Sequence, residues 1–400
     1  MSHRLLLDPA TPAPAVEPGS PTAQQLVQVI KEATVPKADD TREWAVQRLK
    51  TLSRLSPWRL LRQFLHSGDP LDIDAYFDEF ECAALSVDIS GFSTIAERLF
   101  DSHGLAGAEE LAEHINDVLG DICEQLTAAG GDIIKFAGDA CLCVFPANNT
   151  LTGEEYAMDL RCQVLMATRL SLRCIAALDE KKYTVEGVTL TAHSGIGVGP
   201  VTGFLAGGLF QRSEYTLMGT AIAQLGAAEP LAGQGETVVS SACWQMLEHD
   251  CEGQVIDASG QPFTARTPGQ RPHGEWFAKV TATPQPSAVP TSRHLAGTAM
   301  AYSHASGAAQ HWGHSSGVVS VAQQIEALSK EEANMIIEEI KQVVPGQVRQ
   351  KLTQFTPHSV PNLAEFRMVT VVFTRLLGLD YRRGISELKK VQVPPAHPPA

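Results

Sequence analysis

Two aspartates stand where a carboxylate could bind a metal ion. Asp88 lies in the apolar run 83–89, just before a Ser-Gly pair, and Asp139 lies in the sequence Ala-Gly-Asp-Ala at 137–140, between two apolar runs. Magnesium in nucleotide sites takes one or two carboxylates and fills its other positions with water and phosphate oxygens. The pair therefore predicts metal-assisted phosphoryl or nucleotidyl transfer. Each also has a structural interpretation, since Asp88 could cap the following helix and Asp139 could belong to a hairpin turn.

The surrounding pattern predicts the elements that position these carboxylates. The run 83–89 is typical of a strand, and the apolar runs on either side of 137–140 predict a hairpin with Asp139 at or beside its turn. Helical spacing of apolar residues follows at 106–129 and 154–178, and strand patterns occur at 188–199 and 215–219. This order predicts an α+β, ferredoxin-like fold, an antiparallel sheet with helices on one face. If the hairpin pairs with the first strand, both carboxylates project from one end of the sheet.

The two aspartate motifs together carry a family resemblance. VDISGFS at 87–93 and GDIIKFAGDA at 131–140, with YFD at 76–78, closely resemble the class III nucleotide cyclases. The match looks strongest to the first catalytic domain of the soluble, bicarbonate-responsive adenylyl cyclases, and it covers roughly residues 70–250. The resemblance implies an adenylate cyclase half that binds Mg-ATP. In that reaction the ribose 3′-hydroxyl attacks the α-phosphate, giving cyclic AMP and pyrophosphate.

The resemblance also implies a set of site residues. Two Mg²⁺ or Mn²⁺ ions would be held by Asp88, Asp139 and the carbonyl of Ile89, with the two aspartates as the catalytic pair. The implied nucleotide-binding and cofactor-binding residues are Ile89, Ser90, Gly91, Phe92, Ser93 and Lys135. Backbone amides of 90–93 suit phosphate groups. Lys135 matches a lysine that helps to hold bicarbonate, although it could instead be an ordinary solvated residue at a sheet edge.

Three positions depart from the family pattern. Gly226 stands where the resemblance places the arginine of the bicarbonate pocket, which removes a bidentate anion contact and argues against bicarbonate regulation. Ala223 and Ala227 stand where it places an asparagine and an arginine that orient the ribose and stabilise transition-state charge. Activity is therefore expected to need a complementary second cyclase domain, in trans or from a longer product. The alternative is a non-catalytic nucleotide-binding or regulatory module.

Composition limits the partners and the compartment. A net charge of −14 argues against a nucleic-acid partner. The chain has neither a secretory signal at residues 1–7 nor an uncharged apolar run of about 18 residues, so no transmembrane segment is expected. The eight cysteines include no C-x-x-C pair and fall mostly in apolar runs, which favours reduced thiols. These features predict a cytoplasmic protein.

The chain divides by composition into six segments. Residues 70–252 are the expected catalytic domain, preceded by a Pro-rich disordered leader at 1–40 and a helical extension at 41–69 that packs on the domain. Residues 253–320, rich in Gly, Pro, Ser, His and Ala, are expected to be a low-complexity linker. A helical segment is expected at 321–360. Residues 361–400 resemble a truncated start of a second cyclase domain, followed by a Pro-rich tail.

Overall fold

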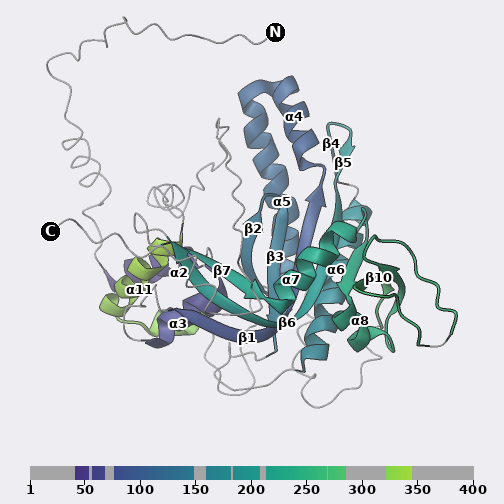
Figure 1. The fold of residues 1–400 in the computed structure, drawn as a ribbon. Helices are drawn as coiled ribbons and strands as arrows, with labels where there is room; N and C mark the ends of the chain where they lie inside the picture. The colour runs from purple at the N-terminus through teal and green to yellow at the C-terminus, as the bar shows by residue number, and fades with distance from the viewer. Residues whose placement is uncertain are drawn as a thin grey trace, which may run out of the picture.

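The computed structural model describes residues 41–53, 56–67, 76–147, 159–181, 183–207, 213–267, 269–284 and 321–344. Eight of the strands in this part form one sheet, in the order β2-β3-β1-β6-β8-β10-β9, with β7 paired to β6 (Figure 1). Their bounds are β1 Phe77–Ser90, β2 Asp132–Ala137, β3 Ala140–Pro146, β6 Thr191–Gly207, β7 Ser213–Gly219, β8 Thr237–Ser240, β9 Glu252–Asp257 and β10 Trp276–Ala282. The short strands β4 Thr184–Val185 and β5 Val188–Thr189 form a separate ribbon.

The core of the sheet has the ferredoxin-like topology that the sequence predicts. Strands β2, β3, β1 and β6 lie side by side, and each neighbouring pair is antiparallel. Helices α4 Phe92–His103 and α5 Gly107–Ala128 lie between β1 and β2 in the sequence, and α6 Leu160–Lys181 lies between β3 and β6. The α+β prediction is therefore confirmed. Strand β8 then extends the sheet by pairing parallel to β6.

Alternation along β1 sends its side chains to two different cores. Leu85 and Val87 pack with α4, α5 and α6, whereas Cys82 and Ala84 pack on the opposite face. Asp88 is an even number of residues along β1 from Cys82 and Ala84, so it lies on this second face. The helices that contribute to the second core are α2 Arg42–Ser53, α3 Trp58–Ser67, α7 Thr220–Ala228, α10 Val321–Ala327 and α11 Lys330–Val343.

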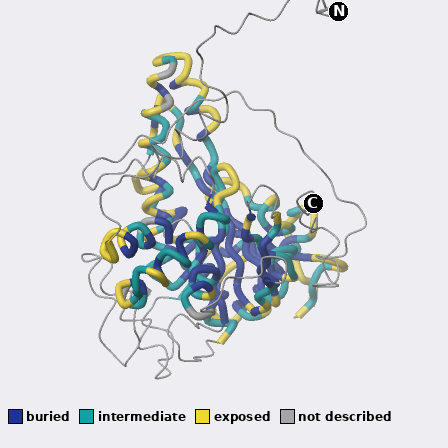
Figure 2. The backbone as a smooth tube through the Cα atoms, turned by 90° about the vertical axis from the view of Figure 1, so that its left-hand side faces the viewer, coloured by how far each residue is buried: buried dark blue, intermediate teal, exposed yellow. Residues whose placement is uncertain are grey.

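The expectation that helices cover only one face of the sheet was wrong. Both faces of the sheet are apolar, and helices cover both. Figure 2 shows the buried residues concentrated in and around the sheet, while the projecting pair of helices is exposed at its tips. In Figure 1, α2, α3 and α11 gather at one end of the sheet, and α8 Ser241–Leu247 lies with β10 at the other.

The segment 41–69 contains two helices, and the second is tied to the Asp139 hairpin. The backbone N–H groups of Trp58 and Arg59, at the start of α3, donate to the Asp132 carboxylate at 2.8 and 3.0 Å. Asp132 begins β2, so a strand residue far along the chain caps this helix. Arg59 also makes a two-pronged ion pair with Asp78 on β1, at 2.7 and 2.9 Å.

The expected linker at 253–320 is partly wrong. Strands β9 and β10 lie inside or across this range and complete the sheet, and Trp276, Phe277, Ala278 and Val280 are buried. The apolar run 276–280 drives β10 into the core, while the Gly- and Pro-rich sequence before it is the loop joining the two strands. The predictions for 1–40, 285–320, 345–360 and 361–400 lie outside the described residues. Among the described residues, no helix combines the length and apolar character that crossing a bilayer requires.

Candidate functional site

The sheet register brings Asp88 and Asp139 to one place. Asp88 pairs with Ala140 across β1 and β3, and Asp139 is the turn residue directly before Ala140. Gly138, the other turn residue, has a φ of 69°, which glycine adopts without strain. The two aspartates named as a catalytic and metal-binding pair therefore lie at one end of neighbouring strands.

The electrostatics of Asp88 are those of a crowded carboxylate. Burial raises its pKa most, repulsion from Asp139 raises it further, and a hydrogen bond shared with Asp139 acts in the same direction. His193 lowers this pKa and Glu229 raises it. The buried Oδ1 atom of Asp88 has no hydrogen-bond partner in the structure. Two adjacent carboxylates with an unpartnered oxygen form a donor set that fits a hard divalent cation.

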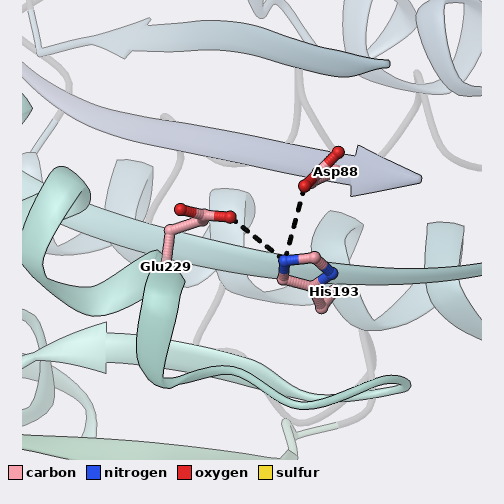
Figure 3. A group of neighbouring side chains, drawn as sticks. All are labelled: Asp88, His193 and Glu229. Carbon is pink, nitrogen blue, oxygen red and sulfur yellow. Dashed lines mark hydrogen bonds and ion pairs between the residues drawn. The ribbon is translucent and has the colours of Figure 1, made fainter. Parts of the chain in front are cut away.

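Two residues that the sequence analysis missed share this site (Figure 3). His193 on β6 is the cross-strand partner of Asp88, and its Nε2 atom lies 3.5 Å from Asp88 Oδ2. The same Nε2 lies 3.0 Å from Oε1 of Glu229, which opens the short 3-10 turn Glu229–Leu231 after α7. The strand pattern at 188–199 could have placed His193 on the face of Asp88 once the register was known. No sequence pattern identifies Glu229.

Glycines in β6 allow this approach. A Cβ atom on Gly195 would lie 2.6 Å from both the Cβ and the amide nitrogen of Glu229. A Cβ on Gly197 would lie 2.1 Å from the carbonyl oxygen of Ala221 in α7. Both contacts are closer than real side chains permit, so the small residues in β6 let α7 and Glu229 rest directly on the strand.

The segment 89–93 forms the junction between β1 and α4. Gly91 has a φ of 115° and is the N-cap of α4, with no side chain capping the first amides. The side chains of Ile89 and Phe92 are buried in the core, so only their backbone groups are available to a ligand. Ser93 is exposed, and Ser90 Oγ lies 3.5 Å from His193 Nδ1. An uncapped helix start beside two carboxylates suits a metal-bound phosphate.

Lys135 lies on β2, and the three positions that depart from the family pattern lie on α7. The Nζ atom of Lys135 is 3.4 Å from Thr216 Oγ1 and 3.7 Å from Glu214 Oε1, both on β7. Its bicarbonate role stays a prediction. Gly226 is exposed on α7, and a Cβ there would meet nothing within 4 Å. Ala223 and Ala227 are half-buried on the same helix.

The thiols carry no covalent link. All eight cysteines lie in the described part of the chain and all are free, and only Cys123 and Cys162 are not fully buried. Burial raises the pKa of Cys243 to about 12 and of Cys174 to about 12, so both stay protonated near neutral pH.

Sequence comparison finds relatives among adenylate cyclases. Adenylate cyclase type 10 of Rattus norvegicus is 28% identical over 205 residues, which are 51% of this chain and 12% of that protein. The protein of that name from Homo sapiens is 28% identical over 188 residues, 47% of this chain and 11% of its own. The match spans only about an eighth of each curated relative. No protein-family model matches the chain.

Structure comparison finds several nucleotide cyclases at low similarity. The adenylyl cyclase CyaB of P. aeruginosa has a TM-score of 0.40 and 17% identity, covering 52% of this chain and 98% of that one. A bacterial light-regulated adenylyl cyclase has a TM-score of 0.41 and 18% identity, covering 67% of each chain. The sequence match confirms the resemblance to class III nucleotide cyclases of the soluble adenylyl type.

Proposed function

We propose that this chain is one catalytic half of a soluble-type adenylate cyclase, which binds Mg-ATP and forms cyclic AMP with a second cyclase domain. The observation that carries the proposal is the meeting of Asp88 and Asp139 at one end of β1 and β3. Similarity to adenylate cyclase type 10 supports the choice of reaction. We propose further that the catalytic domain extends beyond residue 252 and includes β9 and β10, since these strands complete the sheet.

Each residue of the site has a defined task in this proposal. Asp88, Asp139 and the Ile89 carbonyl hold the divalent ions, and the backbone amides of Ser90 to Ser93 receive the phosphates at the start of α4. Two Mg²⁺ ions, when bound, would stabilise charge on the attacking 3′-oxygen and on the leaving pyrophosphate. The new bond joins the 3′-oxygen to the α-phosphorus, the bond to the β-phosphate oxygen breaks, and the hydroxyl proton passes to solvent.

The chain supplies only part of what this reaction needs. Ala223 and Ala227 on α7 offer no amide to orient the ribose and no guanidinium to meet the developing negative charge. A partner domain that provides an asparagine and an arginine across the interface would complete the site. The chain alone, or paired with itself, is expected to bind Mg-ATP and turn it over little or not at all.

The two alanines on α7 also support a second candidate function. A cyclase-like module that pairs with a catalytic domain and modulates it would need no transition-state arginine. The alanines at 223 and 227 favour this candidate, whereas the paired carboxylates favour the enzyme half. Both candidates include a second cyclase domain as partner, and they differ in whether this chain's aspartates are needed for turnover.

Reconstitution tests the proposal. The purified chain is assayed for cyclic AMP formation alone and after addition of a complete second domain of a soluble-type cyclase, with ATP and GTP in parallel and with and without bicarbonate. With ATP as substrate, we expect cyclic AMP to form when the second domain is present and not when it is absent. Bicarbonate is expected to have no effect, because Gly226 supplies no anion contact. Appreciable cyclic AMP from the chain alone would contradict the need for a partner, and none in either case would favour the regulatory module.

A further inference from the structure

Asp88, His193 and Glu229 converge on one point from three different elements. Each offers one ligand atom, and the three atoms all lie within 4.8 Å of one another. Figure 3 shows both carboxylates directed at the same ring nitrogen of His193. Of these residues, the nucleotide site described above uses only Asp88.

Two of the three separations between ligand atoms are close to those around a small transition-metal ion. Zinc binds imidazole nitrogen at about 2.0–2.1 Å and carboxylate oxygen at about 2.0–2.2 Å, so tetrahedral ligand atoms lie about 3.3 Å apart. His193 Nε2 is 3.0 Å from Glu229 Oε1 and 3.5 Å from Asp88 Oδ2. The third pair, Asp88 and Glu229, lies within 4.8 Å, so an ion could enter this cluster after a small adjustment of the two carboxylate side chains.

Hydrogen bonding alone satisfies the cluster poorly. The His193 Nε2 atom has one contact of hydrogen-bond length, 3.0 Å to Glu229 Oε1, and a longer one, 3.5 Å to Asp88 Oδ2. One N–H group can point at only one of these two carboxylates. A metal ion accepts an electron pair from the ring nitrogen and from both carboxylates at once. The Nδ1 atom, 3.5 Å from Ser90 Oγ, then has a hydroxyl nearby to fix the ring.

The ligands sit on a rigid scaffold. Asp88 and His193 are fixed by the long antiparallel pairing of β1 and β6, and Glu229 is held against β6 by the close approach at Gly195. A site built on strands in this way requires little reorganisation when an ion binds.

We propose that Asp88, His193 and Glu229 form a binding site for a zinc-like transition-metal ion, which shares Asp88 with the Mg-nucleotide site and differs from it in its other two ligands. The imidazole ligand favours zinc over magnesium, which prefers oxygen donors and near-octahedral geometry. Ion binding here does not depend on the proposed cyclase function. Its consequence for turnover does, because zinc in this site withdraws Asp88 from the nucleotide's metal ions.

Calorimetric titration of Zn²⁺ into the full, reduced chain near neutral pH, without nucleotide, tests the site. The wild-type chain is compared with H193Q, E229Q and D139N, and with H249Q, which changes an exposed histidine outside the cluster. We expect H193Q and E229Q each to bind one zinc ion fewer per chain than wild type, and H249Q and D139N to match wild type. Any zinc bound by thiols is common to all five chains and cancels in the comparison.

Equal stoichiometry in all five chains would overturn the proposal, since the contacts of His193 with the two carboxylates would then hold without a metal ion. Circular dichroism verifies folding, and E229Q alone decides if H193Q fails to fold. Because nucleotide is absent, the result is independent of the cyclase assay. Zinc bound by D139N together with lost turnover would separate this site from the catalytic one.

Discussion

Asp88 and His193 are cross-strand partners on β1 and β6, and the His193 Nε2 atom lies 3.5 Å from Asp88 Oδ2. The pairing places an imidazole beside a carboxylate that is expected to bind a metal-nucleotide complex. Asp88 therefore belongs to two clusters at once, one with Asp139 and one with His193 and Glu229. Occupancy of either cluster by a cation changes what the other can bind.

Replacing Gly195 by alanine should destabilise the chain and displace Glu229. The new Cβ would lie 2.6 Å from Glu229 Cβ, so the turn after α7 must shift. Overpacking of this kind typically costs about 1–3 kcal/mol of unfolding free energy. Urea denaturation measures the change, with G226A as the matched control. A Cβ at 226 meets nothing within 4 Å, so that variant should be as stable as wild type or more so. Equal stability of G195A and wild type would contradict the close packing.

The ion pair between Arg59 and Asp78 should hold the N-terminal helices on the sheet. Arg59 donates through two nitrogens to Asp78, and its guanidinium carbon lies 3.8 Å from the ring centroid of Phe80. R59K keeps the charge and loses the fork and the planar stacking, which should lower the unfolding free energy by about 1–3 kcal/mol. R173K, at an exposed arginine, is the control and should change little. Chemical denaturation of both variants tests this, and equal losses would argue against a specific role for Arg59.

Asp132 should make stability depend on pH. Burial raises its pKa to about 6 although the Trp58 and Arg59 amides favour the charged form. A carboxyl whose pKa is higher in the folded chain binds protons more tightly there. Stability therefore falls as pH rises from the ordinary aspartate pKa of 3.8 to the folded pKa of about 6, and it levels off above that. Relative to D132N, wild type should lose up to about 3 kcal/mol between pH 4 and pH 7. Urea midpoints across this range give the difference curve, and a flat curve would show that Asp132 titrates normally.

Much of the fold could be predicted from local patterns. Apolar alternation and helical spacing located the ferredoxin-like elements, and the Ala-Gly-Asp-Ala turn placed Asp139 opposite the strand of Asp88. Helices were predicted at 41–69 and 321–360, and the structure has helices in both segments. Their place on a second apolar sheet face was missed, because the face that a strand residue occupies is known only once the strand pairing is known. Strand β10 was missed because a Gly- and Pro-rich loop separates its short apolar run from β9.

The site was predicted in part for a related reason. Motifs contiguous in sequence identified Asp88, Asp139 and the 89–93 junction as candidates, whose roles stay predictions. His193 and Glu229 come together only through the pairing of β1 with β6 and the contact of α7 with Gly195 and Gly197. Neither residue lies in a recognisable motif, so long-range geometry alone brings them to Asp88.

The rate of cyclic AMP formation in the reconstituted pair, measured for D139N and D88N of this chain, tests the central claim most directly. Asparagine keeps the size of aspartate and removes the charge that holds the cations. We predict that either change lowers the rate by about 100-fold or more. The control D121N removes a surface carboxylate paired with Lys181 and should leave the rate unchanged. Wild-type rates from D139N and D88N would contradict the claim that these two side chains hold the metal-nucleotide complex.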